Sequence, residues 1–120
     1  MNRTVVIGAS PNSARYSYEA TLRLKRAGEE VFPLGIRAGK IADIDIITER
    51  RAFPDIDTVT LYVGPQNQEE WSAYILSLKP RRVIFNPGTE NPHMEARFND
   101  AGIETEVACT LVLLATGSYR

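Results

Sequence analysis

Residues 4–18 read TVVIGASPNSARYSY, a short apolar run that stops at Gly8, passes through small polar residues and enters a helical pattern. This order is typical of the strand, turn and helix N-terminus of a nucleotide-binding βαβ unit. In such a unit, unpaired backbone amides and the positive end of the helix dipole attract phosphate. Of the three glycines in the dinucleotide fingerprint G-x-G-x-x-G only Gly8 is present, because Ser10 and Ser13 occupy the other two positions. The stretch therefore predicts a phosphate-bearing ligand.

The loop after the second apolar run narrows the choice of ligand. A nicotinamide dinucleotide site usually places an Asp or Glu about 20 residues beyond the glycines, where it binds the ribose hydroxyls. Here the run at residues 31–34 is followed by GIRAGK, which contains Arg37 and Lys40 and no acid. Arginine and lysine pair with phosphate, which a carboxylate would repel. Two ligands with an extra ribose phosphate fit this loop: coenzyme A, with its 3′-phosphate, and NADP, with its 2′-phosphate.

Length and composition indicate one cytoplasmic domain spanning residues 1–120, long enough to bury its own core. The 14 basic and 15 acidic residues nearly cancel, which argues against a nucleic-acid partner. The apolar runs fall short of the roughly 20 residues that cross a bilayer, and no signal-peptide pattern is visible. A single cysteine, Cys109, fits a reducing compartment. No cluster of Cys, His and carboxylate residues has metal-ligand spacing, so we expect no metal site.

Strand and helix patterns alternate along the chain. Short β-branched runs that end at glycine or proline predict strands at residues 4–7, 30–33, 58–63, 82–85 and 105–108. Apolar seams with helical spacing predict helices around residues 20–27, 71–78, 94–101 and 109–117. Residues 35–57 lack a helical period, so a loop with a short extended piece replaces one crossover helix.

This alternation predicts an α/β fold: a Rossmann-like, doubly wound parallel sheet of about five strands in the order 3-2-1-4-5. Ligands of such sheets bind beyond the carboxyl ends of the strands, where the strand order reverses. The loops that we expect at this edge are residues 8–17, 34–40, 64–68 and 86–91.

These loops resemble those of the coenzyme A-binding domain family, small bacterial proteins similar to the N-terminal Rossmann-type domain of the succinyl-CoA synthetase alpha subunit. The resemblance covers nearly the whole chain. It rests on VIGASPN at 6–12, YSY at 16–18, FP at 32–33 and NPGTEN at 86–91. It implies that the first loop and the following serine hold the diphosphate of the cofactor. The loop after the second strand then contributes to holding its adenosine end.

Carried over residue by residue, the resemblance puts Gly8, Ser10 and Ser17 at the diphosphate, with Arg15 as a helper. Many relatives have Asn-Pro and a following Lys after the second strand, whereas this chain has LGIR at 34–37, so Arg37 or Lys40 has to supply that cation. The full set of expected cofactor-binding residues is Gly8, Ala9, Ser10, Arg15, Ser17, Gly35, Arg37, Lys40, Gly64, Pro65, Gly88 and Glu90.

The sequence leaves three functions open. The first is binding of coenzyme A or an acyl-CoA with no catalysis assigned, since the synthetase's catalytic phosphohistidine belongs to another domain. The second is an NADP-dependent oxidoreductase or nucleotide sensor that uses the same loops. The third is an interaction module whose nucleotide site is vestigial. Whether Cys109, at the start of the last helix, is a core residue or a reactive thiol also stays open, as does homodimer formation.

Overall fold

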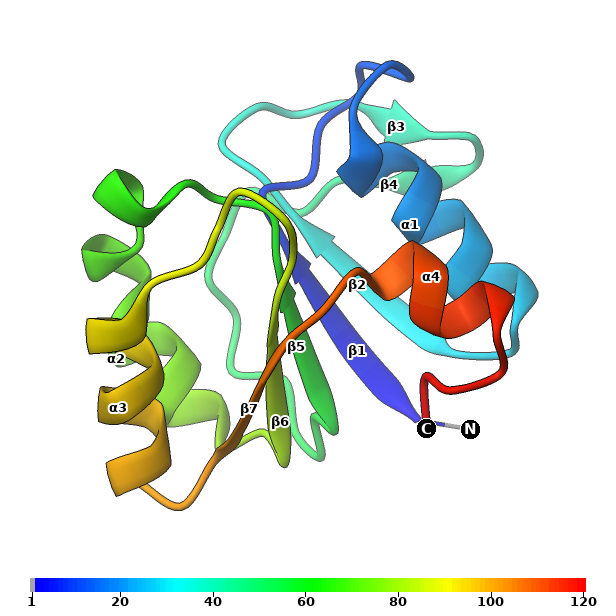
Figure 1. The fold of residues 1–120 in the computed structure, drawn as a ribbon. Helices are drawn as coiled ribbons and strands as arrows, with labels where there is room; N and C mark the ends of the chain where they lie inside the picture. The colour runs from blue at the N-terminus through cyan, green and yellow to red at the C-terminus, as the bar shows by residue number, and fades with distance from the viewer. Residues whose placement is uncertain (1) are drawn as a thin grey trace.

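Five parallel strands form the main sheet of the computed structural model, which describes residues 2–120 (Figure 1). These strands are β1 (Arg3–Ile7), β2 (Glu30–Leu34), β5 (Thr58–Leu61), β6 (Arg82–Phe85) and β7 (Glu104–Val107). The helices are α1 (Tyr16–Arg26), α2 (Glu69–Leu78), α3 (Pro92–Asp100) and α4 (Thr110–Ala115). Each predicted strand and each predicted helical seam is therefore present, although β5 and α4 are shorter than the sequence indicated.

The helices cover both faces of the sheet. α1 and α4 lie side by side on one face, and α2 and α3 lie side by side on the other (Figure 1). Strands that are covered on both faces have no solvent side, and every residue of β5 and β6 is buried. The predicted class, an α/β doubly wound parallel sheet, is confirmed. No helix within residues 2–120 combines the length and apolar character needed to cross a membrane.

The strand order is β2-β1-β5-β6-β7, which corrects the prediction in one place. The predicted order 3-2-1-4-5 put the run at residues 58–63 outside the second strand, but this run, β5, pairs with β1. The place outside β2 is taken by Ile47, which forms a single parallel bridge with Leu34. With this bridge counted as the third strand, the order is the 3-2-1-4-5-6 of dinucleotide-binding sheets. The assignment of the third strand was wrong because a one-residue bridge has no periodicity to mark it.

A small hairpin stands where the crossover helix is missing. It consists of β3 (Lys40–Ile41) and β4 (Ile44–Asp45), which pair antiparallel and lie near α1. Ile41 and Ile46 are buried in the core on this side of the sheet. The prediction that residues 35–57 contain a loop with a short extended piece is confirmed.

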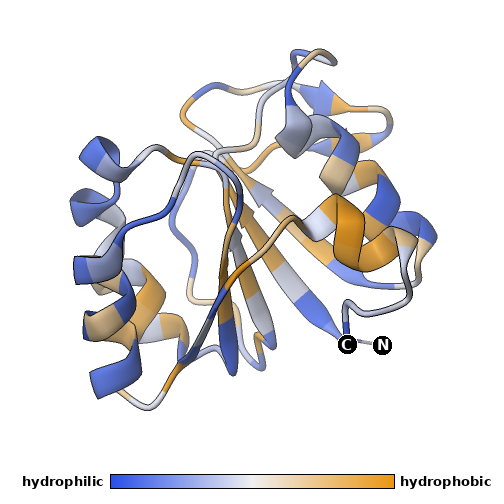
Figure 2. Cartoon of the chain, viewed as in Figure 1, coloured by the Kyte–Doolittle hydropathy of each residue, from blue (hydrophilic) through white to orange (hydrophobic). Residues whose placement is uncertain are grey.

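The core is divided by the sheet into two apolar layers. Successive side chains of a strand point to opposite faces, so Val5 and Ile7 of β1 pack toward α2 and α3, whereas Val6 packs toward α1 and α4. Figure 2 shows the hydrophobic colour gathered in the strands and in α4, with hydrophilic turns on the outer sides of α2 and α3. The burial of both faces fixes the sheet, and the loops that follow its strands meet along one edge.

Candidate functional site

A cleft of about 680 Å³ opens at the carboxyl edge of the sheet. It is lined by the loops after β1, β2, β5 and β6, which is where the strand order reverses between β1 and β5. The lining residues come from 8–12, 15–17, 35–37, 62–63, 67, 70–71 and 87–89. The sequence predicts a ligand at this edge, and the structure brings four separate loops together there.

Gly8 makes the close approach of β1 and β5 possible. Its φ is +98°, and a Cβ at this position would lie 2.8 Å from the carbonyl oxygen of Tyr62. The amides of Gly8 and Ala9 both donate to the carbonyl oxygen of Leu34, at 3.0 and 2.8 Å. These two amides are therefore already hydrogen-bonded within the fold. The role of Gly8 is to adopt a positive φ and to let the Tyr62 backbone approach closely.

Amides without an acceptor among the described residues come further along the chain, at the start of α1. Asn12 shapes the first loop: its amide donates to Ser10 Oγ at 3.1 Å, and its Oδ1 accepts from the Ala14 amide at 2.9 Å. α1 has no side-chain cap, and within the described residues 2–120 the amides of Tyr16 and Ser17 have no acceptor. Both residues line the cleft. Unpaired amides at the start of an eleven-residue helix make a site for an anion.

Two arginines add positive charge to this half of the cleft. Arg15 precedes α1 and Arg37 follows β2, and both line the cleft. Neither side chain has a hydrogen bond or an ion pair with another residue in the described part of the chain. Lys40 lies outside the lining residues, and its Nζ is 2.7 Å from Asp45 Oδ1, a bond that raises the pKa of Lys40. Of the two cations that the sequence offered after the second strand, Arg37 is the one at the cleft.

Eight of the twelve expected residues line the cleft: Gly8, Ala9, Ser10, Arg15, Ser17, Gly35, Arg37 and Gly88. The other four, Lys40, Gly64, Pro65 and Glu90, are not lining residues. Gly64 precedes a 3₁₀ turn that begins at Pro65, and Glu90 Oε1 accepts a hydrogen bond of 2.8 Å from the Gly88 amide. Glu90 therefore braces the loop after β6, which accounts for its presence without any ligand.

Several lining residues were not among the twelve expected cofactor-binding residues. Tyr16 and Ile36 are 76% and 93% exposed, and both line the cationic half of the cleft. At the other half, Glu70 and Trp71 come from the first turn of α2. Trp71 has helical spacing with the core residues that follow it, so its pattern predicts a core residue and not one that lines a cleft. Tyr16 belongs to the YSY motif and Ile36 to the loop expected after the second strand, but no pattern marked either side chain as a ligand contact.

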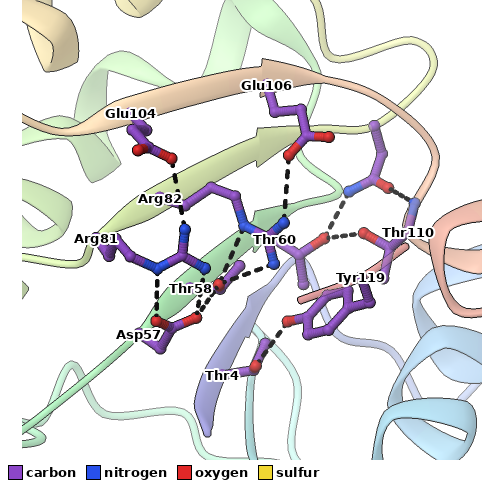
Figure 3. A network of polar contacts seen from close by, with 11 residues as sticks. Thr4, Asp57, Thr58, Thr60, Arg81, Arg82, Glu104, Glu106, Thr110 and Tyr119 are labelled. Carbon is purple, nitrogen blue, oxygen red and sulfur yellow. Dashed lines mark hydrogen bonds and ion pairs between the residues drawn. The ribbon is translucent and has the colours of Figure 1, made fainter. Parts of the chain in front are cut away.

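The opposite edge of the sheet holds a second polar cluster, shown in Figure 3, which has a different character. Asp57 forms a two-pronged contact with Arg81, at 2.8 and 3.1 Å, which lowers the pKa of Asp57. Arg82 is buried, donates to Thr58 at 3.2 Å and pairs with Glu106 at 3.2 Å. These groups satisfy one another across neighbouring strands, so this cluster reads as structural.

Cys109 lies directly before α4, as the sequence placed it, and is half-buried. It is not among the residues that line the cleft. The nearby Tyr62 hydroxyl is buried with no partner within the described residues, and burial raises the pKa of Tyr62.

Comparison with known proteins gives the class of the molecule. The family model described as a CoA binding domain matches residues 2–115, so the chain belongs to the CoA-binding domain family. This membership supports a CoA-binding role in general terms. Eight of the expected residues line a cleft at the edge where this fold binds nucleotides.

Solved structures support the fold over the whole chain. A structure titled as an uncharacterized protein is 49% identical, with a TM-score of 0.95 and 98% of each chain covered. A Thermus thermophilus protein titled cell-free ID.343 is 18% identical, with a TM-score of 0.83 and coverage of 98% of this chain and 90% of that one. A hypothetical protein from Pyrococcus horikoshii OT3 is 23% identical, with a TM-score of 0.80 and coverage of 91% and 78%. A search among curated proteins found no match.

Proposed function

We propose that this protein binds coenzyme A or an acyl-CoA in the cleft at the carboxyl edge of the sheet. The observation that carries the proposal is the gathering, in one cleft of a CoA-binding domain, of the uncapped N-terminus of α1 and two arginines that have no partner within residues 2–120. Coenzyme A carries a diphosphate and a separate ribose phosphate, so it needs two places for anions. The cleft offers both.

The diphosphate is assigned to the start of α1. The unpaired amides of Tyr16 and Ser17 supply donors aligned with the helix dipole, and Arg15 adds a charge that pairs with phosphate in two-pronged geometry. Ser10 and Asn12 hold the loop in the shape that leaves these amides open. A phosphate bound here would accept hydrogen bonds from the Tyr16 and Ser17 amides, which have no acceptor within residues 2–120.

The adenosine end is assigned to the loop after β2. Arg37 faces the cleft without a partner in the described chain and can pair with the 3′-phosphate. Tyr16 and Ile36 expose large apolar surfaces at the same end, and a planar base laid against them would remove that surface from water. We assign binding and no reaction: the one histidine, His93, is exposed at the start of α3 and does not line the cleft.

Isothermal titration of one preparation with coenzyme A, dephospho-coenzyme A, NADP, NAD and ATP tests the proposal. We expect saturable binding of coenzyme A, on the order of ten to a hundred times tighter than the dephospho form, because a charge-assisted contact contributes roughly 1.5–3 kcal/mol. NADP bound more tightly than coenzyme A would instead favour an oxidoreductase or sensor. Absence of binding by all five ligands would favour an interaction module.

A further inference from the structure

The charge of the side chains that line the cleft changes from positive at one end to negative at the other. The strand order places its loops in the sequence β2, β1, β5 and β6, three strand spacings or about 14 Å from the first to the last. Arg15 and Arg37 are on the loops of β1 and β2. Glu70 lines the other half, on the β5 side, together with Asn67 and Trp71. A ligand that spans the cleft therefore meets cations at one end and a carboxylate at the other.

The proposed function fixes which end of coenzyme A reaches Glu70. If its phosphates lie at Arg37 and at the start of α1, the pantetheine arm has only the β5 and β6 half left to occupy. The thiol, or the acyl group attached to it, then lies near Trp71, Asn67 and the loop at Gly88. This half is lined by Val63, Pro87 and Asn67, and by Trp71, which is itself only 5% exposed.

Glu70 is the carboxylate that lines this half of the cleft. Within residues 2–120 its carboxylate has no ion pair, whereas the neighbouring Glu69 is paired with Arg97 at 2.9 Å. The Arg50 guanidinium stacks over the Trp71 ring, 3.9 Å from its centroid, and donates to the backbone carbonyl of Glu70. Arg50 is not a lining residue of the cleft. Glu70 also offsets the positive end of the α2 dipole, which would otherwise attract an anion.

We propose that Glu70 makes this site selective for coenzyme A and its uncharged acyl derivatives, and that it disfavours acyl groups ending in a carboxylate. This inference rests on the proposed function and concerns its substrate class. The effect is modest in size because Glu70 is exposed and its field is screened by salt.

Two stable thioethers of equal chain length test the selectivity: S-butyl-CoA and S-(3-carboxypropyl)-CoA. In low salt, we expect the native protein to bind the carboxylate analogue on the order of three to ten times more weakly than the butyl analogue. The Glu70→Gln variant should lose most of this difference, which is read as the ratio of the two affinities in the same protein, so that any change in overall affinity for coenzyme A cancels. Glu69→Gln is the matched control, since it removes a charge from the same helix turn and should leave the difference intact.

The outcomes separate the inference from the function beneath it. Failure of coenzyme A to bind would overturn the proposed function. Normal binding of coenzyme A with equal affinity for the two analogues, or a difference that survives in Glu70→Gln, would overturn the selectivity alone. Tighter binding of the carboxylate analogue that disappears in Arg50→Gln would overturn it as well, because Arg50 would then govern this end of the cleft.

Discussion

The two edges of the sheet are both rich in polar groups, yet they use them in opposite ways. At the amino edge, Asp57, Arg81 and Arg82 contact one another or their neighbours on β5, β6 and β7 (Figure 3). At the carboxyl edge, Arg15 and Arg37 have no partner within residues 2–120, and the first amides of α1 are open. Charged groups that are satisfied within the fold stabilise it. Charged groups that are left open in a cleft are available to a ligand.

The same contrast applies to the chain segment that closes each edge. Tyr119, near the C-terminus, packs against the amino edge, where its hydroxyl is 2.7 Å from Thr4 Oγ1 and its ring lies 4.7 Å from the Arg82 guanidinium. Arg120 pairs with the buried carboxylate of Glu29 beside it. No segment of the described chain covers the carboxyl edge in this way, since the cleft is open there. The comparison predicts that substitutions at the amino edge change stability, whereas most at the carboxyl edge change binding.

The largest effect is expected at a carboxyl-edge residue that departs from this rule. Gly8→Ala should lower the free energy of unfolding by about 3 kcal/mol or more, because it adds a left-handed backbone penalty to a Cβ only 2.8 Å from Tyr62. Gly88→Ala is the control: its φ is +91°, but a Cβ there meets nothing within 4 Å. It should lose about 1–2 kcal/mol. If urea denaturation gives equal losses of unfolding free energy for the two variants, the Tyr62 backbone moves away from the added Cβ at no cost.

At the amino edge, Arg82→Met should lower the free energy of unfolding by about 2 kcal/mol, since it removes the bonds of a buried guanidinium to Thr58 and Glu106. Affinity for coenzyme A should not change. Arg81→Met is a milder counterpart, because Arg81 is half-exposed, and should lose about 1 kcal/mol or less. A large loss of affinity in Arg82→Met with unchanged stability would reverse the roles assigned to the two edges.

Arg37→Ala should remove most of the preference for coenzyme A over its dephospho form, a factor on the order of ten to a hundred. The loss of the phosphate and the loss of the arginine remove the same contact, so their effects should not add in a double-mutant cycle. Lys40→Ala removes an equal charge from a residue that pairs with Asp45 outside the cleft. If Lys40→Ala abolishes the preference and Arg37→Ala does not, the 3′-phosphate binds to Lys40 of the β3–β4 hairpin and not to Arg37.

The smallest effect is a change in acid stability at the amino edge. Arg81 holds the pKa of Asp57 below its ordinary value of 3.8, so the ionised carboxylate stabilises the folded state above that pH. This contribution is lost as the pH falls through the lowered pKa. Asp57→Asn should therefore lower the free energy of unfolding by about 1 kcal/mol at pH 7. The gap between native and variant protein should close in strong acid; a gap that widened there would contradict the pairing.

Much of the fold was predictable because its signals are local. β-branched runs marked all five strands of the main sheet, and apolar seams marked the helices. The expected ligand edge followed from the alternation of the two. The third-strand position was not predictable, because Ile47 occupies it with a single bridge.

The site was predictable only as far as its loops. The choice between Arg37 and Lys40 depends on the β3–β4 hairpin, which brings Asp45 next to Lys40. The positions of the charged residues along the chain do not predict this pairing. Glu70 belongs to no motif in the sequence, and its place in the cleft depends on how α2 packs against the sheet. The amino-edge cluster joins residues more than 20 positions apart, such as Asp57 and Arg81, which no local pattern reveals.

The most direct test of the division between the edges is a titration of isotope-labelled protein with coenzyme A, followed through its backbone amide resonances. We predict saturable shifts in the loops that line the cleft, above all at Ser10, Tyr16, Ser17 and Arg37. The amide resonances of Thr4, Asp57, Arg81 and Glu104, at the amino edge, should shift no more than those of residues far from the cleft. Saturable shifts confined to the amino edge, with the α1 amides unmoved, would contradict the assignment of the carboxyl edge as the ligand site.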